Sequence, residues 1–181
     1  MIQNIVILDR DGVINHESSD YIKSPDEWTP IPGSLDAIAL LHQHKYRVFV
    51  ATNQSGIARG LYSEATLTAI HQKMQQRVVD AGGRIDGIVY CQHHPNENCS
   101  CRKPKPGLLR QVERLSGESI AGCPFVGDSL RDIEAAQAGG CEPVLVLTGN
   151  GKQTKRQISS SVLTFADLSK FADYAVTTHP D

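Results

Sequence analysis

The stretch Ile5-Val6-Ile7-Leu8-Asp9-Arg10-Asp11-Gly12-Val13 decides how the rest of the chain is interpreted. Its four leading apolar residues are typical of a parallel strand that is covered on both faces. Two carboxylates and a glycine follow directly, at the carboxyl end of the strand, where open α/β sheets bind their ligands. A simple surface turn also favours Asp and Gly. The stretch therefore indicates either a functional site or an ordinary turn.

The composition is that of an ordinary globular protein, with 181 residues, 40% hydrophobic and 21% charged. We expect a single domain over residues 1–181. The formal net charge of −2 provides no basic field for nucleic acid. No apolar run approaches the ~20 residues that cross a bilayer, and the N-terminus has no basic leader. We expect a cytoplasmic monomer that binds neither nucleic acid nor membranes.

Apolar runs alternate with amphipathic segments along most of the chain, which predicts a parallel, doubly wound, Rossmann-like α/β sheet with right-handed crossovers. The strands are expected at 5–8, 47–52, 85–90, 123–128 and 143–147. Ser34 and Ser63 are each expected to cap a helix, and further helices are expected to begin at Pro106 and Ser129.

Three other segments are less regular. Residues 16–32 are polar and contain prolines, which predicts a long loop or flap that could fold over the acidic turn, or else a passive surface loop. Residues 152–161 are expected to form a polar connector. Near the C-terminus we expect a short helix around Asp167 and a last strand at 174–176.

Polar or charged side chains lie at the ends of four consecutive strands or just beyond them. They are Asp9 and Asp11, Thr52 and Asn53, Arg102 and Lys103, and Asp128. Because the carboxyl ends of parallel strands share one edge of a sheet, we expect these side chains to form one site. Asp9 and Asp128 supply the oxygen ligands that Mg²⁺ prefers. A solvated basic turn remains the alternative for the cations that follow Cys101.

The loop after the third strand carries four sulfur or nitrogen ligands within eleven residues, at Cys91, His93, Cys99 and Cys101. This is a donor set that tetrahedral zinc accepts, although His94 could replace His93. Because all four ligands come from the protein, the zinc would be structural and would shape the loop. A set of unligated thiols is the alternative, but exposed thiols are prone to oxidation.

The residues at these strand ends suit phosphoryl transfer through an aspartyl phosphate. Asp9 would attack phosphorus, while Mg²⁺, Lys103 and the Thr52 hydroxyl neutralise the charge on the phosphoryl oxygens. Asp11 would protonate the leaving alcohol and later deprotonate the attacking water. The backbone alternation places Arg10 away from both aspartates, and no role is assigned to it.

The motifs Asp9-x-Asp11-Gly12-Val13, Thr52, Lys103 and Gly127-Asp128-x-x-x-Asp132 resemble the haloacid dehalogenase (HAD) superfamily. The finer pattern adds Thr52-Asn53-Gln54-Ser55-Gly56, Cys-x-His with Cys-x-Cys, and Cys101-Arg102-Lys103-Pro104-Lys105-Pro106-Gly107. This pattern is similar to that of the D-glycero-D-manno-heptose 1,7-bisphosphate 7-phosphatases. The resemblance implies a HAD-like fold with little or no cap and a zinc-binding loop.

The same resemblance implies roles for individual residues. Asp9, Asp11 through its backbone carbonyl, and Asp128 would hold magnesium. Thr52 and Lys103 would hold the phosphoryl group, and Arg102 would recognise the rest of a sugar phosphate substrate. Residues 17–21 would meet the sugar. A histidinol-phosphate phosphatase shares most of these motifs, and a non-catalytic zinc-stabilised binding module is the remaining alternative.

Overall fold

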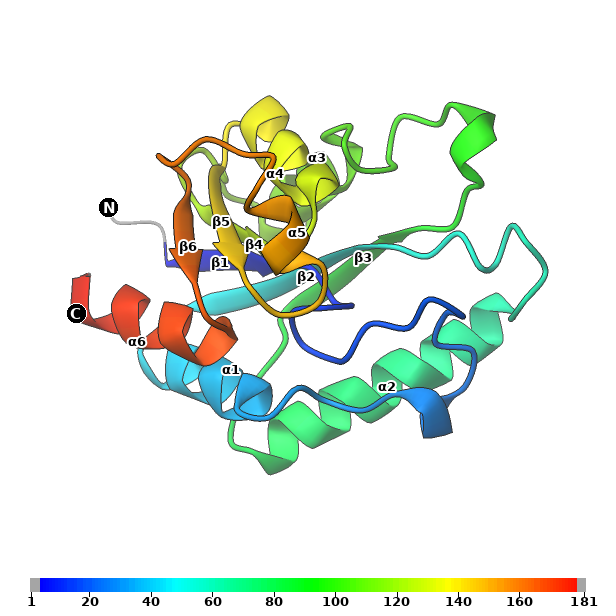
Figure 1. Cartoon of the computed structure of the whole chain (residues 1–181). Coiled ribbons are helices and arrows are strands. Elements are labelled where there is room, and N and C mark those ends of the chain that lie inside the picture. The colour runs from blue at the N-terminus through cyan, green and yellow to red at the C-terminus, as the bar shows by residue number, and fades with distance from the viewer. Residues whose placement is uncertain (1–3, 179–181) are drawn as a thin grey trace.

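A six-stranded parallel sheet forms the centre of the computed structural model, which describes residues 4–178 (Figure 1). The strands are β1 (Ile5–Leu8), β2 (Arg47–Asn53), β3 (Gly87–Cys91), β4 (Pro124–Gly127), β5 (Glu142–Val146) and β6 (Leu163–Phe165). Their spatial order is β3-β2-β1-β4-β5-β6. This is the order of a doubly wound Rossmann-like sheet, as the alternating apolar runs predict.

Helices cover both faces of the sheet (Figure 1). One face carries α1 (Ser34–Gln43), α2 (Glu64–Asp80) and α6 (Leu168–Thr178). The other carries α3 (Gly107–Ser116) and α4 (Leu130–Gly139). The short elements are η1 (Pro25–Glu27), η2 (Pro95–Glu97) and α5 (Gly151–Thr154).

Successive side chains of β1 pack against opposite helical layers. Val6 and Leu8 pack into the core beneath α1, α2 and α6, whereas Ile5 and Ile7 pack into the core beneath α3 and α4. All four side chains are at most 1% exposed. A strand with successive side chains on opposite faces needs an unbroken apolar run when both faces are covered, and this is the pattern at 5–8.

The strand order reverses at β1, which pairs with β2 on one side and β4 on the other. The chain leaves the two central strands toward opposite layers, so a crevice opens beyond their carboxyl ends. The register pairs Leu8 with Val126, and the Asp9 backbone N–H donates to the Val126 carbonyl at 2.9 Å. This register places the residues after β1 beside those after β4.

Three local expectations were wrong. Residues 174–176 belong to α6 and not to a strand, because Leu168, Phe171 and Ala175 recur at helical spacing and are buried. The expected connector at 152–161 starts within α5. The N-cap of α1 is Gly33, and the Ser34 hydroxyl instead donates to the Ile14 carbonyl at 2.6 Å.

The segment 16–32 is anchored to α2 rather than lying loosely on the surface. Trp28 is 1% exposed. The Lys73 ammonium donates to the carbonyl oxygens of Pro25 at 2.6 Å and Trp28 at 3.2 Å. The preceding residues, 17–22, are therefore held in place from their C-terminal side. Across residues 4–178, no helix combines the length and the apolar character needed to cross a membrane.

A buried histidine lies on the inner side of α2. His71 Nε2 is 3.1 Å from Arg10 Nη1, and both residues are buried. An Arg side chain can only donate, so Nε2 must accept and the ring is neutral, with its proton on Nδ1. Burial, followed by the charge of Arg10, lowers the pKa of His71 to about 3, although Asp11 opposes the shift.

This histidine makes stability depend on pH. In the unfolded chain it takes up a proton near pH ~6.5, whereas in the folded chain it stays neutral, so acid favours unfolding. The contribution present at pH 7 should fall by about 2 kcal/mol at pH 5. His71→Gln keeps an acceptor but cannot titrate in this range. Urea unfolding between pH 7 and pH 5 should therefore show a smaller loss of stability in this variant.

The control is His42→Gln, which removes an exposed histidine of α1 and should keep the wild-type dependence. Equal losses in wild type and His71→Gln would contradict the assignment of a neutral buried histidine.

Candidate active site

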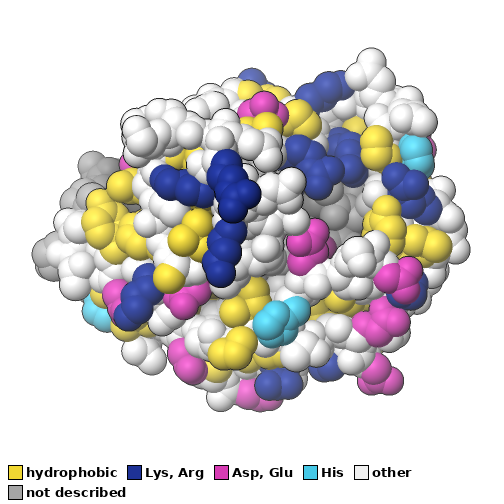
Figure 2. Space-filling model, viewed as in Figure 1, with side chains coloured by type: hydrophobic (Ala, Val, Ile, Leu, Met, Phe, Trp, Pro, Cys, Tyr) yellow, Lys and Arg dark blue, Asp and Glu magenta, His cyan; other side chains and the backbone are white. Residues whose placement is uncertain are grey.

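A pocket of about 260 Å³ lies beyond the carboxyl ends of the central strands. Figure 2 shows a hollow on this face, with Lys and Arg side chains gathered along its upper rim. The pocket is lined by all seven residues that the sequence predicts for catalysis, for magnesium and for the substrate. These are Asp9, Asp11, Thr52, Asn53, Arg102, Lys103 and Asp128.

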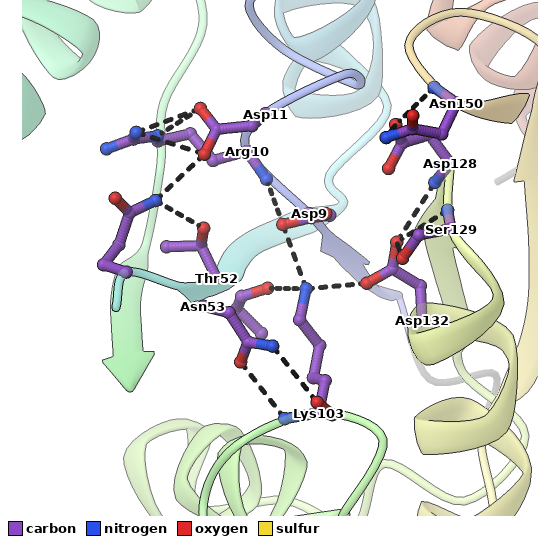
Figure 3. Close-up of polar contacts among 12 residues, drawn as sticks. Asp9, Arg10, Asp11, Thr52, Asn53, Lys103, Asp128, Ser129, Asp132 and Asn150 are labelled. Atoms are coloured by element: carbon purple, nitrogen blue, oxygen red, sulfur yellow. Dashed lines mark hydrogen bonds and ion pairs between the residues drawn. The ribbon is translucent and has the colours of Figure 1, made fainter. Parts of the chain in front are cut away.

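Lys103 lies at the floor of the pocket and is 2% exposed. Its ammonium donates to the Ala51 carbonyl at 3.0 Å and to Asp132 Oδ1 at 2.7 Å, and it lies 3.0 Å from Asp9 Oδ1. Three acceptors thus match its three N–H groups (Figure 3). Burial opposes the charge, but Asp132 and Asp9 outweigh this effect and raise the pKa of Lys103.

The end of β2 fixes the backbone that carries this lysine. Asn53 Nδ2 donates to the Lys103 carbonyl, and the Lys103 N–H donates to Asn53 Oδ1, both at 3.1 Å (Figure 3). The adjacent Thr52 is 1% exposed, and its Oγ1 accepts a hydrogen bond from Gln54 at 2.9 Å. Asn53 thus positions Lys103, while Thr52 presents a hydroxyl to the same pocket.

Asp132 is a site residue to which the sequence reasoning gave no role of its own. It lies in the first turn of α4, and its Oδ2 accepts from the backbone N–H groups of Asp128 at 3.1 Å and Ser129 at 3.0 Å. Its other oxygen pairs with Lys103. The only signal in the sequence is the spacing Asp128-x-x-x-Asp132, which brings two carboxylates to one turn of a helix.

Asp9, Asp128 and Asp132 form a group of carboxylates whose nearest oxygens all lie within 4.8 Å of one another. Burial, followed by the charge of Asp132, raises the pKa of Asp9 to about 7. Burial and the charges of Asp9 and Asp132 raise the pKa of Asp128 to about 8. Lys103 neutralises only one of these three charges. Carboxylates so close together favour a bound cation, and oxygen donors of this kind suit Mg²⁺.

The backbone around Asp128 leaves no room for larger residues. Gly12 has a φ of +81°, and a Cβ atom at this position would collide with Asp128 Oδ2. The glycine after Asp11 is therefore required by a left-handed turn and by a close carboxylate. On its other side, Asp128 Oδ2 accepts from the Asn150 N–H at 2.8 Å, and Asn150 Nδ2 donates to Glu17 at 2.6 Å.

Asp11 lies apart from this carboxylate group. In Figure 3 its carboxylate points toward Arg10, whereas that of Asp9 points toward Lys103. Burial disfavours its charge, but Arg10 and the hydrogen bonds from Asn15 and Gln54 outweigh burial and lower the pKa of Asp11. The expectation that Arg10 points away from both aspartates is wrong for Asp11. β1 ends at Leu8, and the turn that follows no longer alternates.

A positively charged rim borders the pocket. Arg102 and Arg131 both line it, and Arg131 was not predicted from the sequence. Arg102 Nη1 is buried and has no hydrogen-bond partner among the described residues. Burial, followed by the charge of Arg131, lowers the pKa of Arg102. Two guanidinium groups at one rim can bind an anionic group of a ligand that reaches beyond the carboxylates.

The predicted zinc ligands lie together beside the pocket. Cys101 Sγ lies 3.1 Å from Cys91 Sγ and 3.7 Å from Cys99 Sγ, and His93 Nδ1 lies 3.3 Å from Cys101 Sγ. A tetrahedral zinc with bonds of ~2.3 Å would separate its sulfurs by about 3.8 Å. The donor set and the 3.7 Å separation fit zinc, and the 3.1 Å separation would widen when the metal binds. His94 is not in this group, and its side chain accepts from Asn96 N.

Comparisons with known proteins agree with this architecture. A family model described as HAD-hydrolase-like matches residues 100–170. A Pseudomonas aeruginosa protein named D-glycero-beta-D-manno-heptose-1,7-bisphosphate 7-phosphatase is 52% identical over 173 residues, which are 95% of this chain and 97% of that protein. A Bordetella bronchiseptica protein of the same name is 54% identical over 153 residues, covering 84% of this chain and 86% of its own.

Solved structures give the same result. The crystal structure of D,D-heptose 1,7-bisphosphate phosphatase from B. bronchiseptica, complexed with magnesium and phosphate, superposes with a TM-score of 0.93 at 48% identity. The match covers 97% of this chain and 99% of that one. Identity at this level over nearly the whole chain shows that the protein belongs to the heptose-1,7-bisphosphate 7-phosphatase family of HAD-like hydrolases.

Proposed function

We propose that this protein is a magnesium-dependent phosphatase that removes the 7-phosphate of D-glycero-β-D-manno-heptose 1,7-bisphosphate through an aspartyl-phosphate intermediate. The observation that carries the proposal is the group of Asp9, Asp128 and Asp132, of which Asp9 and Asp132 pair with Lys103, with Asp11 lining the same pocket. The names of the relatives support the substrate, and the magnesium and phosphate bound to the B. bronchiseptica enzyme support the cofactor.

Asp9 is the nucleophile in this proposal. Within residues 4–178, both hydrogen-bond donors to Asp9 reach Oδ1, which lies 2.7 Å from the Arg10 backbone N and 3.0 Å from Lys103 Nζ. These contacts leave Oδ2 to attack phosphorus. The bond from Asp9 Oδ2 to phosphorus forms while the bond from phosphorus to the sugar oxygen breaks, and Asp11 gives its proton to that oxygen.

In the second half of the reaction, a water molecule replaces the sugar. Asp11, now ionised, takes a proton from the water while the water oxygen attacks phosphorus and the Asp9–phosphorus bond breaks. The positive charge of Lys103 neutralises charge on the phosphoryl oxygens in both steps, and the Thr52 hydroxyl, whose oxygen accepts from Gln54, donates its hydrogen to one of them. Asp9, Asp128 and the Asp11 carbonyl would hold Mg²⁺, which supplies further positive charge to the phosphoryl group.

The substrate assignment depends on the rim of the pocket. A bisphosphate carries a second anionic group, and Arg102 and Arg131, which both line the pocket, provide guanidinium donors for it. Residues Glu17, Ser18 and Tyr21 line the same pocket, as expected for contacts with a sugar. A substrate with one phosphate would leave the two arginines without their anion.

Substrate comparison tests this assignment. We expect kcat/KM for the β anomer of the heptose 1,7-bisphosphate to exceed that for the α anomer and, by at least ~100-fold, that for histidinol phosphate. The measurement is phosphate release at matched Mg²⁺ concentrations. A higher kcat/KM for histidinol phosphate would overturn the proposed substrate. A higher value for the α anomer would correct the anomer alone.

Replacement of the nucleophile tests the mechanism. Asp9→Asn should lower kcat by about four orders of magnitude or more, because an amide oxygen cannot form the acyl phosphate. Inorganic phosphate should still bind, because Lys103 and Thr52 are unchanged, and calorimetry can measure this. Asp173→Asn, on the exposed side of α6, is the matched control and should retain full activity. Substantial turnover by Asp9→Asn would exclude Asp9 as the nucleophile.

We also propose that Cys91, His93, Cys99 and Cys101 bind one structural zinc, which would hold the loop that precedes Arg102 and Lys103. Elemental analysis of protein purified without chelator should find about one zinc per chain. Cys99→Ser should lose the zinc and raise KM, because the loop that carries Arg102 loosens. Cys123→Ser, a buried thiol outside the group, should retain the zinc. Equal zinc contents in the two variants would contradict the proposal.

A further inference from the structure

Arg10 has no part in the mechanism above, yet its side chain is fully buried against Asp11. Arg10 Nε donates to Asp11 Oδ1 at 3.0 Å, and Arg10 Nη2 donates to Oδ1 at 2.9 Å and to Oδ2 at 3.2 Å (Figure 3). No other ion pair of Arg10 occurs among the described residues. A buried guanidinium with a single carboxylate partner fixes the orientation of that carboxylate.

The two oxygens of Asp11 are held unequally. Oδ1 accepts two N–H groups from Arg10 and a third from Asn15 Nδ2 at 2.9 Å. Oδ2 accepts from Gln54 Nε2 at 3.0 Å and has only the longer contact with Arg10. Three donors occupy Oδ1, whereas a proton on Oδ2 displaces only the longer contact with Arg10. Oδ2 is therefore the oxygen that carries a proton on Asp11.

Two further hydrogen bonds orient the side chains of Arg10 and Gln54, which contact Asp11. His71 Nε2 accepts from Arg10 Nη1, which holds the guanidinium plane from the α2 side. The Tyr62 hydroxyl donates to Gln54 Oε1 at 2.7 Å. That bond turns the amide so that Gln54 Nε2 faces Asp11 Oδ2 and Thr52 Oγ1. The orientation of Asp11 is thus set by residues that lie outside the reacting group.

We propose that Arg10 is a positioning residue that anchors Asp11 Oδ1, so that Oδ2 alone exchanges the proton during catalysis. The inference rests on the proposed role of Asp11 as general acid and base. In the first step, the Oδ2 proton passes to the sugar oxygen as its bond to phosphorus breaks. In the second step, Oδ2 receives a proton from the attacking water as the Asp9–phosphorus bond breaks. Arg10 itself gains and loses no proton.

This role has a kinetic signature that a purely structural role lacks. A sugar alcohol is a poor leaving group and needs the proton from Asp11, whereas the nitrophenolate of p-nitrophenyl phosphate leaves without one. Misplacing Asp11 should therefore slow the sugar substrate far more than the aryl substrate. A general loosening of the pocket would slow both substrates to the same extent.

The test variant is Arg10→Lys, which keeps the charge but cannot form the two-pronged contact. Under single-turnover conditions with excess enzyme, we expect the rate with the heptose bisphosphate to fall by about 10- to 100-fold and that with p-nitrophenyl phosphate by less than about threefold. The KM for the sugar substrate should change little. Circular dichroism and thermal unfolding establish that the variant is folded.

His71→Leu is the second variant, because it leaves Arg10 in place but removes the acceptor that orients it. It should show the same selectivity for the sugar substrate with a smaller loss, and it keeps the inference testable if Arg10→Lys does not fold. Arg77→Met is the matched control, since Arg77 is an exposed cation in the last turn of α2. The rates with both substrates should be unchanged in this control.

The variant Asp11→Asn distinguishes the proposed role of Asp11 as general acid and base from the proposed role of Arg10 as its anchor. Retention of sugar phosphate turnover by Asp11→Asn would refute the proposed function of Asp11 itself. A selective loss of turnover with the sugar substrate in Asp11→Asn would support the role of Asp11. If Arg10→Lys and His71→Leu then slow both substrates equally, or slow neither, the proposed role of Arg10 is refuted. Selective losses in all three variants would support both.

Discussion

The rest of the site depends on the buried ammonium of Lys103. A charge removed from water is costly unless acceptors surround it, and this one reaches acceptors from β2, from the turn after β1 and from α4. The loop after β3 must therefore return to the sheet edge with accurate placement. The pairing of Asn53 with the Lys103 backbone and the group of three cysteines and a histidine both serve that requirement. The carboxylate group, the floor of the pocket and the fold are in this sense parts of one electrostatic arrangement.

Asp9 and Asp11 show how two aspartates one residue apart can acquire different chemistry. Asp9 lies among other carboxylates, and its pKa is raised to about 7. Asp11 lies against Arg10, and its pKa is lowered. Both shifts run opposite to the proposed roles, since a nucleophile must be ionised and a general acid must be protonated. A cation bound beside Asp9 would lower the pKa of Asp9, and the negative charge of a phosphorylated substrate would raise the pKa of Asp11. The glycine after Asp11 makes the separation possible, because its left-handed turn brings Asp128 to one side of the chain.

Much of the fold and site could be predicted from the sequence because apolar runs fix strands, and strands that are parallel bring their polar ends to one edge. The failures occurred where a local rule was applied beyond its range. Strand alternation was extended past Leu8 to Arg10, although the strand ends there. The period of α6 was mistaken for that of a strand. Arg131 and the partners of Asp132 depend on contacts across distant segments, which a single sequence does not reveal.

The anchoring of Trp28 has a consequence for how such an enzyme can diversify. Withdrawing a side chain of this size from the core would cost about 2–3 kcal/mol, so the chain that follows the pocket wall formed by residues 17–22 is fixed to the core. The wall takes its support from α2, whereas Asp9 and Asp128 follow β1 and β4, and Asn150 joins the two through Glu17 and Asp128. Under the proposed function, substitutions at wall positions other than Glu17 would alter which sugar is accepted while the phosphoryl chemistry is retained.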